Sequence, residues 1–150
     1  MDDYFDTRSN SHEYYKKLDK VFCPALDMFV YFPSSGFNHI IYKKDRKVRD
    51  KISQVSRFKS LQNAVFIIEK STTYQEYELI NKKVLVKQGE EFMVKDKEIQ
   101  YWGLIAIIGN SKIKVVLRKI GNGNLQFWSV IPYWITSIKR DKNFTSSPEI

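Results

Sequence analysis

The hydrophobic period changes once along this chain, and this change limits the fold more than any other feature. Up to Phe58, apolar side chains recur about every three to four positions, which is typical of amphipathic helices. Beyond Glu69, apolar and polar side chains alternate, as they do in strands with one buried face. Helices followed by strands predict an α+β domain, with N-terminal helices packed on a twisted antiparallel β-sheet.

Two segments of the first part carry helix start signals. Asn10 or Ser11 can cap a helix that should end before Pro24. Asp45 can cap a second helix that starts near Arg46. Each segment places its apolar residues on one helical face, so each is expected to pack against the sheet.

The segments around these helices are predicted from turn residues and composition. Residues 61–69 either continue the second helix or restart it. Residues 26–32 and 37–42 are expected to be short extended pieces on either side of a Pro-Ser-Ser-Gly turn. The two ends, residues 1–9 and 140–150, are expected to be a flexible arm and a loose tail.

The second part of the chain predicts a sheet of about four to five strands. Turns of glycine and asparagine separate the last three strands. Asn122-Gly123 is the strongest hairpin signal, because a type I′ turn needs positive φ at both central positions. The predicted strand segments are residues 76–86, 91–95, 99–108, 112–120 and 125–131.

This last hairpin assigns side chains to the two faces of the sheet. It places Val116 opposite Ser129 and Arg118 opposite Phe127. Arg118 and Ser129 then share a face with Lys114, which suits a cleft that holds a base and a phosphate. The other face is apolar and should pack on the helices; it comprises Ile113, Val115, Leu117, Trp128 and Val130.

The composition fits one folded domain in the cytoplasm. With 43% hydrophobic and 15% aromatic residues, residues 1–150 can bury a single core. Cys23 is the only cysteine, which excludes an intramolecular disulfide, and its apolar neighbours favour a buried, inert thiol. The N-terminal residues lack the order of a signal peptide, and no apolar run is long enough to span a bilayer. We therefore expect a cytoplasmic protein without a membrane partner.

The positive charge is concentrated in one segment. The net charge is +8, and eight cations lie between Lys43 and Lys59 against two carboxylates. Such clustering favours RNA as a partner, although it is also typical of a solvated helix face. The candidate nucleic-acid-binding residues are Lys44, Arg46, Arg49 and Arg57 in this segment, Lys114 on the sheet, and Tyr133 and Trp134, which could stack on bases.

His39 lies directly before this basic segment. The imidazole of histidine can take or give a proton near neutral pH, so His39 is either a catalytic residue or a structural histidine in a short strand. His12, near the first helix, is expected at the surface. The carboxylates are scattered and the two histidines lie far apart, so no metal and no cofactor are expected.

Several of these motifs occur in an order that resembles a known family. Phe29-Val30-Tyr31-Phe32-Pro33, Ser35-Gly36-Phe37-Asn38-His39-Ile40, a basic helix, and strands at 115–119 and 126–130 follow one another. Over about residues 15–135 the chain is similar to the phage-associated branch of the barnase–EndoU–colicin–RelE (BECR) fold. The resemblance implies a metal-independent ribonuclease that cleaves RNA through attack by the ribose 2′-hydroxyl. It also implies a toxin of a toxin–antitoxin, phage or mobile-element system, silenced by an acidic antitoxin or immunity protein.

The resemblance also implies roles for particular residues. Four side chains match the motifs of the family by position and would be catalytic: His39, Lys43, Arg118 and Ser129. Residues 15–135 contain His39 but not the second histidine that EndoU-type members use. The general acid is therefore open, with Lys43, Arg57 and Tyr133 as the candidates.

Two alternatives from other functional classes remain. The first is a non-catalytic nucleic-acid-binding module on the same scaffold, which would bind RNA or DNA in a salt-dependent way without cleaving it. The second is a small basic structural protein of a mobile element, whose charge mediates assembly.

Overall fold

The sequence folds into helices packed on one curved sheet. The computed structural model describes the backbone of residues 3–43 and 45–135, and the side chains of residues 4–43 and 45–132. The expected tail at 140–150 lies outside the described residues. The helices are α1 (Asp3–Lys16), α2 (Ser34–Ile41), α3 (Lys51–Lys59) and α4 (Leu61–Lys70), and the strands are β1 (Val21–Cys23), β2 (Met28–Tyr31), β3 (Glu76–Gln88), β4 (Glu91–Ile108), β5 (Ser111–Ile120) and β6 (Leu125–Ile135).

The described strands form a single sheet in the order β1-β2-β6-β5-β4-β3. All neighbouring strands are antiparallel except β2 and β6, which run parallel through Val30↔Leu125 and Tyr31↔Gln126. The predicted α+β class is confirmed. The predicted strand count was too low, because the N-terminal hairpin of β1 and β2 joins the sheet beside β6.

Two strand predictions were wrong for identifiable reasons. Residues 91–95 and 99–108 belong to one long strand, since β3 pairs with β4 without interruption from Glu76↔Gly103 to Gln88↔Glu91. Residues 37–42 are not extended, because all but the last lie in α2. Phe37, Ile40 and Ile41 are buried at helical spacing. The segment is so short that its sequence can also be read as the alternating pattern of a strand.

The first helix begins and ends earlier than predicted. It starts at Asp3, so residues 3–9 are helical rather than a flexible arm, and it ends at Lys16. The Tyr4 hydroxyl helps to fix this first turn by donating a hydrogen bond of 2.6 Å to Gln54 Oε1 in α3. Residues 21–23, which were expected to end the helix, instead pair with β2.

The helix in the basic segment also starts later than predicted. Asp50, not Asp45, is its N-cap, and its carboxylate accepts a hydrogen bond of 2.7 Å from the backbone N–H of Ser53. The residues before it form a loop in which Arg46 has a positive φ of 68°. Residues 61–69 restart a helix after Ser60, as one of the two predicted alternatives required.

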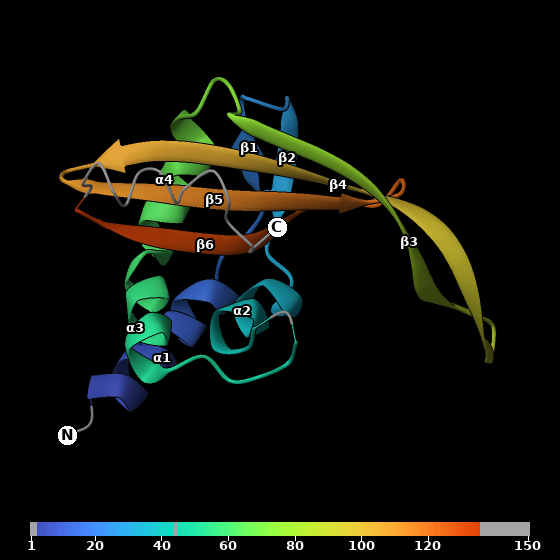
Figure 1. Cartoon of the computed structure of the whole chain (residues 1–150), viewed down its shortest axis with the longest axis horizontal. Coiled ribbons are helices and arrows are strands. Elements are labelled where there is room, and N and C mark those ends of the chain that lie inside the picture. The colour runs from blue at the N-terminus through green and yellow to red at the C-terminus, as the bar shows by residue number, and fades with distance from the viewer. Residues whose placement is uncertain (1–2, 44, 136–150) are drawn as a thin grey trace.

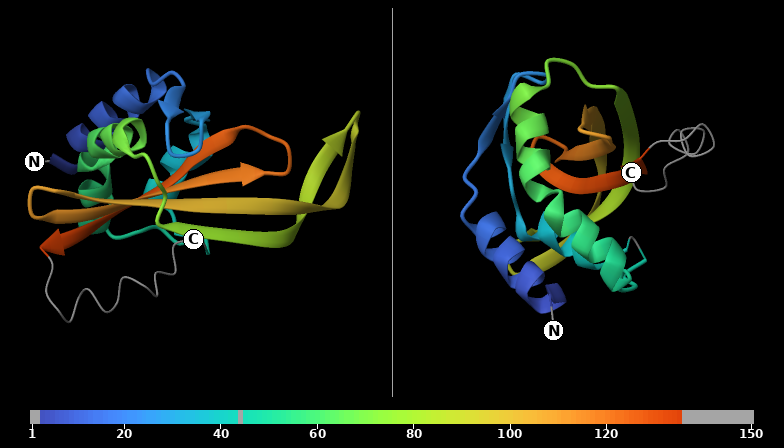
Figure 2. Two further views of the ribbon diagram at one scale, coloured as in Figure 1. Left: turned by 90° about the horizontal axis from the view of Figure 1, so that it is seen from above. Right: turned by 90° about the vertical axis from the view of Figure 1, so that its left-hand side faces the viewer.

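The helices cover one face of the sheet and continue past one of its edges (Figures 1 and 2). We call the covered face the helix face; its strand residues Leu104, Val115, Leu117, Phe127 and Val130 belong to the main core with residues of all four helices. The opposite face, here the polar face, carries Tyr101, Val116, Arg118 and Ser129. Within the described residues, no helix has the length and apolar character needed to cross a membrane.

The two longest strands run beyond the rest of the sheet (Figures 1 and 2). β5 pairs with β4 only as far as Ile99↔Ile120, whereas β3 continues beside β4 to the turn at Gly89. Residues 81–98 therefore form a two-stranded hairpin that projects from the body of the protein. We call this segment the β3–β4 arm.

Candidate functional site

Three side chains from distant parts of the sequence meet around one indole ring. The rings of His39 in α2 and Trp128 in β6 are stacked, with centroids 4.5 Å apart and an interplanar angle of 29°. The guanidinium carbon of Arg118 lies 3.7 Å from the centroid of the same Trp128 ring. Tyr101 lies directly opposite Arg118 in the sheet and packs in the same apolar cluster as Trp128. We call His39, Tyr101, Arg118 and Trp128 the Trp128 cluster.

An incomplete sheet edge lets His39 reach this position. β2 pairs with β6 only at Leu125 and Gln126, so the described remainder of β6 has no strand on that side. The helices α2 and α3 lie along this edge instead (Figure 1). A histidine on α2 can therefore contact the sheet beside β6.

A β-bulge turns Trp128 to the polar face. Val116 pairs with Ser129 as predicted, but the next residue of β5, Leu117, pairs with Phe127. Trp128 is therefore an extra residue of β6 between Phe127 and Ser129. Arg118 consequently lies opposite Gln126, not opposite Phe127. The predicted faces of Trp128 and Phe127 were wrong, because Phe127 packs in the main core and Trp128 packs with the residues of the polar face.

Arg57 and Ser129 form a second contact between helix and sheet. The Nη1 group of Arg57 in α3 donates a hydrogen bond of 2.8 Å to the carbonyl oxygen of Val130 and lies 3.4 Å from Ser129 Oγ. Both side chains are buried. Arg57 therefore binds the edge of β6 next to the Trp128 cluster and is not at the surface, where its candidate role in nucleic-acid binding had placed it.

Lys114 also lies on the polar face, and Glu76 neutralises it. The two side chains form an ion pair, although β4 separates their strands. Gly103 on β4 makes this contact possible: a Cβ atom at this position would lie 3.0 Å from Glu76 Oε1 and 3.4 Å from Lys114 Cε. The predicted binding residue Lys114 is thus 1% exposed and already has an anionic partner.

Burial changes the proton affinity of the central cation. Desolvation lowers the pKa of Arg118, while the neighbouring Tyr101 side chain acts in the opposite direction. Because the pKa of an arginine side chain lies far above neutral pH, Arg118 keeps its charge at pH 7. The Trp128 cluster therefore holds a permanent, partly desolvated cation beside an imidazole and a phenol.

The remaining predicted residues lie elsewhere. Lys43 and Arg46 are exposed in the loop after α2, where the backbone N–H of Arg46 donates to the carbonyl oxygen of Lys43. Arg49 is buried, and its Nε donates a hydrogen bond of 3.0 Å to the carbonyl oxygen of His39. The side chains of Lys44, Tyr133 and Trp134 lie outside the described residues. Of the four predicted catalytic residues, His39 and Arg118 are in the Trp128 cluster and Ser129 follows Trp128.

Sequence reasoning missed Tyr101 and Trp128. Tyr101 could have been found, because continuing the pairing outward from the Gly109-Asn110 turn places it opposite Arg118. Trp128 carried no such signal, since its position depends on the bulge. The buried and inert thiol predicted for Cys23 fits the structure, in which burial raises the pKa of the thiol.

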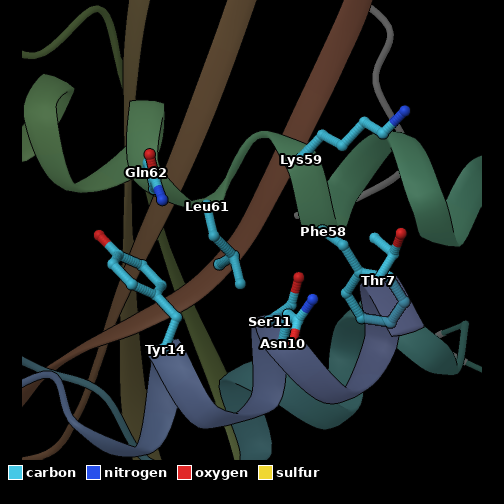
Figure 3. Close-up of a pocket in the computed structure, with 8 residues that line it drawn as sticks. All are labelled: Thr7, Asn10, Ser11, Tyr14, Phe58, Lys59, Leu61 and Gln62. Atoms are coloured by element: carbon cyan, nitrogen blue, oxygen red, sulfur yellow. The ribbon is translucent and has the colours of Figure 1, made fainter. Parts of the chain in front are cut away.

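Two cavities of the described residues lie apart from the Trp128 cluster. One of about 330 Å³ lies between α1 and the α3–α4 junction (Figure 3). Its walls include Asn10, Tyr14, Phe58 and Gln62, none of which was predicted as a site residue. A smaller pocket of about 250 Å³ includes Arg57 in its wall. Within the described residues, no three His, Cys, Asp or Glu side chains lie close enough together to hold a metal ion.

No protein-family model, curated protein or solved structure matches this chain. The function is therefore inferred from the residues and the geometry of this protein.

Proposed function

We propose that this protein is a metal-independent endoribonuclease whose active site is the Trp128 cluster. The observation that carries the proposal is the meeting of His39, Arg118 and Tyr101 on one sheet face around Trp128. These side chains supply a proton acceptor, a phosphate-binding cation and a hydroxyl donor, which RNA cleavage without a metal requires. The resemblance of the sequence to the BECR ribonucleases supports the same activity.

In the proposed reaction, His39 removes the proton from a ribose 2′-oxygen. This oxygen attacks the adjacent phosphorus, the bond from phosphorus to the 5′-oxygen breaks, and the 5′-oxygen takes a proton. The products are a 2′,3′-cyclic phosphate and a free 5′-hydroxyl. Arg118 stabilises the negative charge that grows on the phosphate oxygens as the reaction proceeds.

Tyr101 is the proposed general acid. Among the sequence candidates, Lys43 is exposed in the loop after α2, and Arg57 is committed to the carbonyl oxygen of Val130. The side chain of the third candidate, Tyr133, lies outside the described residues. Tyr101 faces Arg118 directly and carries a hydroxyl proton that it can donate. It would take the place of the second histidine of EndoU-type enzymes.

One observation favours a second function, a non-catalytic nucleic-acid-binding module. His39 is only 6% exposed and its ring is stacked on Trp128, whereas a general base must touch the 2′-hydroxyl. In this function His39 would only support Trp128 and the adjoining binding surface. RNA would be retained in a salt-dependent way and would not be cleaved.

Incubation of total RNA with the protein in excess EDTA tests the proposal. The wild type should cleave, and His39→Ala and Arg118→Ala should each lose about a hundredfold or more of the rate, the lower range for general acid–base catalysis. His12→Ala is the matched control, because this histidine packs on Phe37 away from the Trp128 cluster, and it should cleave normally. Normal cleavage by His39→Ala would exclude His39 as the base. Retention of RNA by a wild type that cleaves nothing would support the binding module.

We further propose that the ribonuclease is a cytoplasmic toxin of a toxin–antitoxin, phage or mobile-element system. The exposed cations around α3 support an acidic antitoxin or immunity protein as the partner that silences it. These cations are Lys43, Arg46, Lys47, Lys51 and Lys59.

A further inference from the structure

The two faces of the β3–β4 arm differ in how their lysines are paired. On one face Lys82 lies directly opposite Lys97, so two positive charges oppose each other. On the other face Lys83 lies directly opposite Asp96, an attractive pair. The arm therefore has one neutralised face and one face with a repulsive pair, although both carry lysines.

The face with the repulsive pair continues into the polar face of the sheet. Side chains two positions apart share a face, so Lys95 and Lys97 on β4 lie on the same face as Tyr101. Lys97 is about 13 Å from Tyr101 along the strand. The uncharged residues Ile80, Ile99 and Ile120 occupy the sheet between the lysines and Arg118.

The body of the protein contacts the base of this lysine group. A Cβ atom on Gly121, in the β5–β6 turn, would lie 3.8 Å from Lys97 Nζ. The ammonium group thus lies beside this turn, where the arm leaves the sheet. Carboxylates on the same face are Glu91 near the tip and Glu78 and Glu76 beside the body, and Glu76 already neutralises Lys114.

Like charges directly opposite each other destabilise a strand pair, and a bound anion would remove this cost. We propose that Lys82, Lys95 and Lys97 form a binding site for the phosphate backbone of RNA that extends from the Trp128 cluster. The choice of RNA rests on the proposed function. The site would hold nucleotides outside the cleavage position and so increase affinity for long substrates over short ones.

The distribution of apolar residues favours RNA over a protein partner at this face. Lysine is depleted in the cores of protein interfaces. The most exposed apolar residues of the arm, Leu85, Phe92 and Val94, lie on the opposite face, where Leu85 and Val94 face each other. A protein would therefore find its apolar contacts on the face that lacks the repulsive lysine pair.

Two double variants with equal loss of charge provide the test. Lys82→Gln/Lys97→Gln removes two charges from the proposed site, and Lys83→Gln/Lys87→Gln removes two charges from the other face of the same arm. The probe is a single-stranded 2′-O-methyl RNA oligonucleotide, which lacks the hydroxyl needed for cleavage. The first variant should bind about tenfold more weakly, with its salt slope reduced by about 1.4 for two lost phosphate contacts. The second should bind within about twofold of the wild type, because it leaves the site intact.

Each outcome either supports or overturns the inference. Equal weakening by both double variants would mean a non-specific charge effect, and unchanged binding by the first would mean no site at Lys82 and Lys97. Self-association of the first variant with unchanged binding would assign these lysines to protection of the sheet edge instead.

The result is separable from the proposed ribonuclease activity, which is measured by cleavage of a dinucleotide too short to reach the arm. A first variant that cleaves the dinucleotide normally but loses the long probe supports both proposals. A wild type that never cleaves, together with loss of the probe by the first variant, supports the arm site alone.

Discussion

Single residues decide whether the polar face tolerates its charges. Lys114 is 1% exposed, and its ammonium group depends on Glu76 for a compensating charge. A buried ion pair adds little net stability, but removal of one partner leaves an uncompensated charge. Gly103 is part of the same arrangement, because a Cβ atom at that position would crowd both Glu76 and Lys114.

Glu76→Gln is therefore expected to lower the free energy of unfolding by about 2 kcal/mol, less than for a fully buried pair because the Glu76 side chain is 29% exposed. Urea denaturation measures this change. Glu98→Gln, an exposed substitution on the neighbouring strand, should cost less than about 0.5 kcal/mol. Adding Lys114→Met to Glu76→Gln should restore most of the loss. If the double variant is no more stable than the single one, the uncompensated charge is not the cause.

At the scale of elements, α3 shows how a small error in helix assignment arises. Asp45 and Asp50 both precede helical sequence and both can act as caps. The structure uses Asp50, while Asp45 accepts a hydrogen bond of 3.1 Å from the backbone N–H of Lys47 within the loop. Local propensity does not distinguish the two residues, because the choice depends on how Arg49 is buried against α2.

Substitution of Asp50 and of Asp45 compares the contribution of the helix cap to stability with that of the loop hydrogen bond. Asp50→Ala should reduce the free energy of unfolding by about 1 kcal/mol, the usual cost of losing an N-cap. Asp45→Ala removes the same charge and should cost less, because its bond joins loop residues that are exposed. Thermal or urea unfolding of the two variants measures both costs. A larger loss for Asp45→Ala would mean that the loop, not the cap, positions α3.

The elements also show what the sequence could and could not predict. The antiparallel strands 111–120 and 125–135 follow from alternation and a glycine-containing turn, so the hairpin and the common face of Arg118 and Ser129 were predictable. The predicted type I′ turn was wrong, because Gly121, and neither Asn122 nor Gly123, has the positive φ, of 54°. The predicted pair Val116↔Ser129 is present because the extra residue in the bulge restores the register. The bulge at Trp128 was not predictable, because it is set by packing on both faces of β6. The helix α2 was missed because eight residues give too few turns for the helical period to stand out. His39 was therefore assigned to the wrong element.

At the scale of the whole molecule, the positive charge has two distinct uses. Arg49 and Arg57 come from the basic segment but are buried, and they hold α2 and α3 against each other and against β6. The exposed cations around α3 and the lysines of the β3–β4 arm remain at the surface. A sequence count of charge cannot separate these groups, because it contains no information on burial.

If the protein is a toxin, expression in a bacterial host should slow growth, and His39→Ala and Arg118→Ala should each relieve the effect. His12→Ala should remain as toxic as the wild type. Growth curves, with soluble protein quantified for every variant, provide the measurement. Relief counts only where the variant accumulates in soluble form to the level of the wild type. Undiminished toxicity of both soluble variants would contradict the proposed site, and harmless wild-type protein would contradict the toxin proposal.

The parallel pairing of β2 with β6 has a consequence for the order of folding during synthesis. The ribosome releases the N-terminal helices and the β1–β2 hairpin first, but Leu125, the partner of Val30, follows 95 residues later in the sequence. Contacts so distant in sequence form late and slowly. His39 is synthesised before this interval and Trp128 after it, so their rings can stack only after β6 has been made. A growing chain is thus without its proposed active site until Trp128 has left the ribosome.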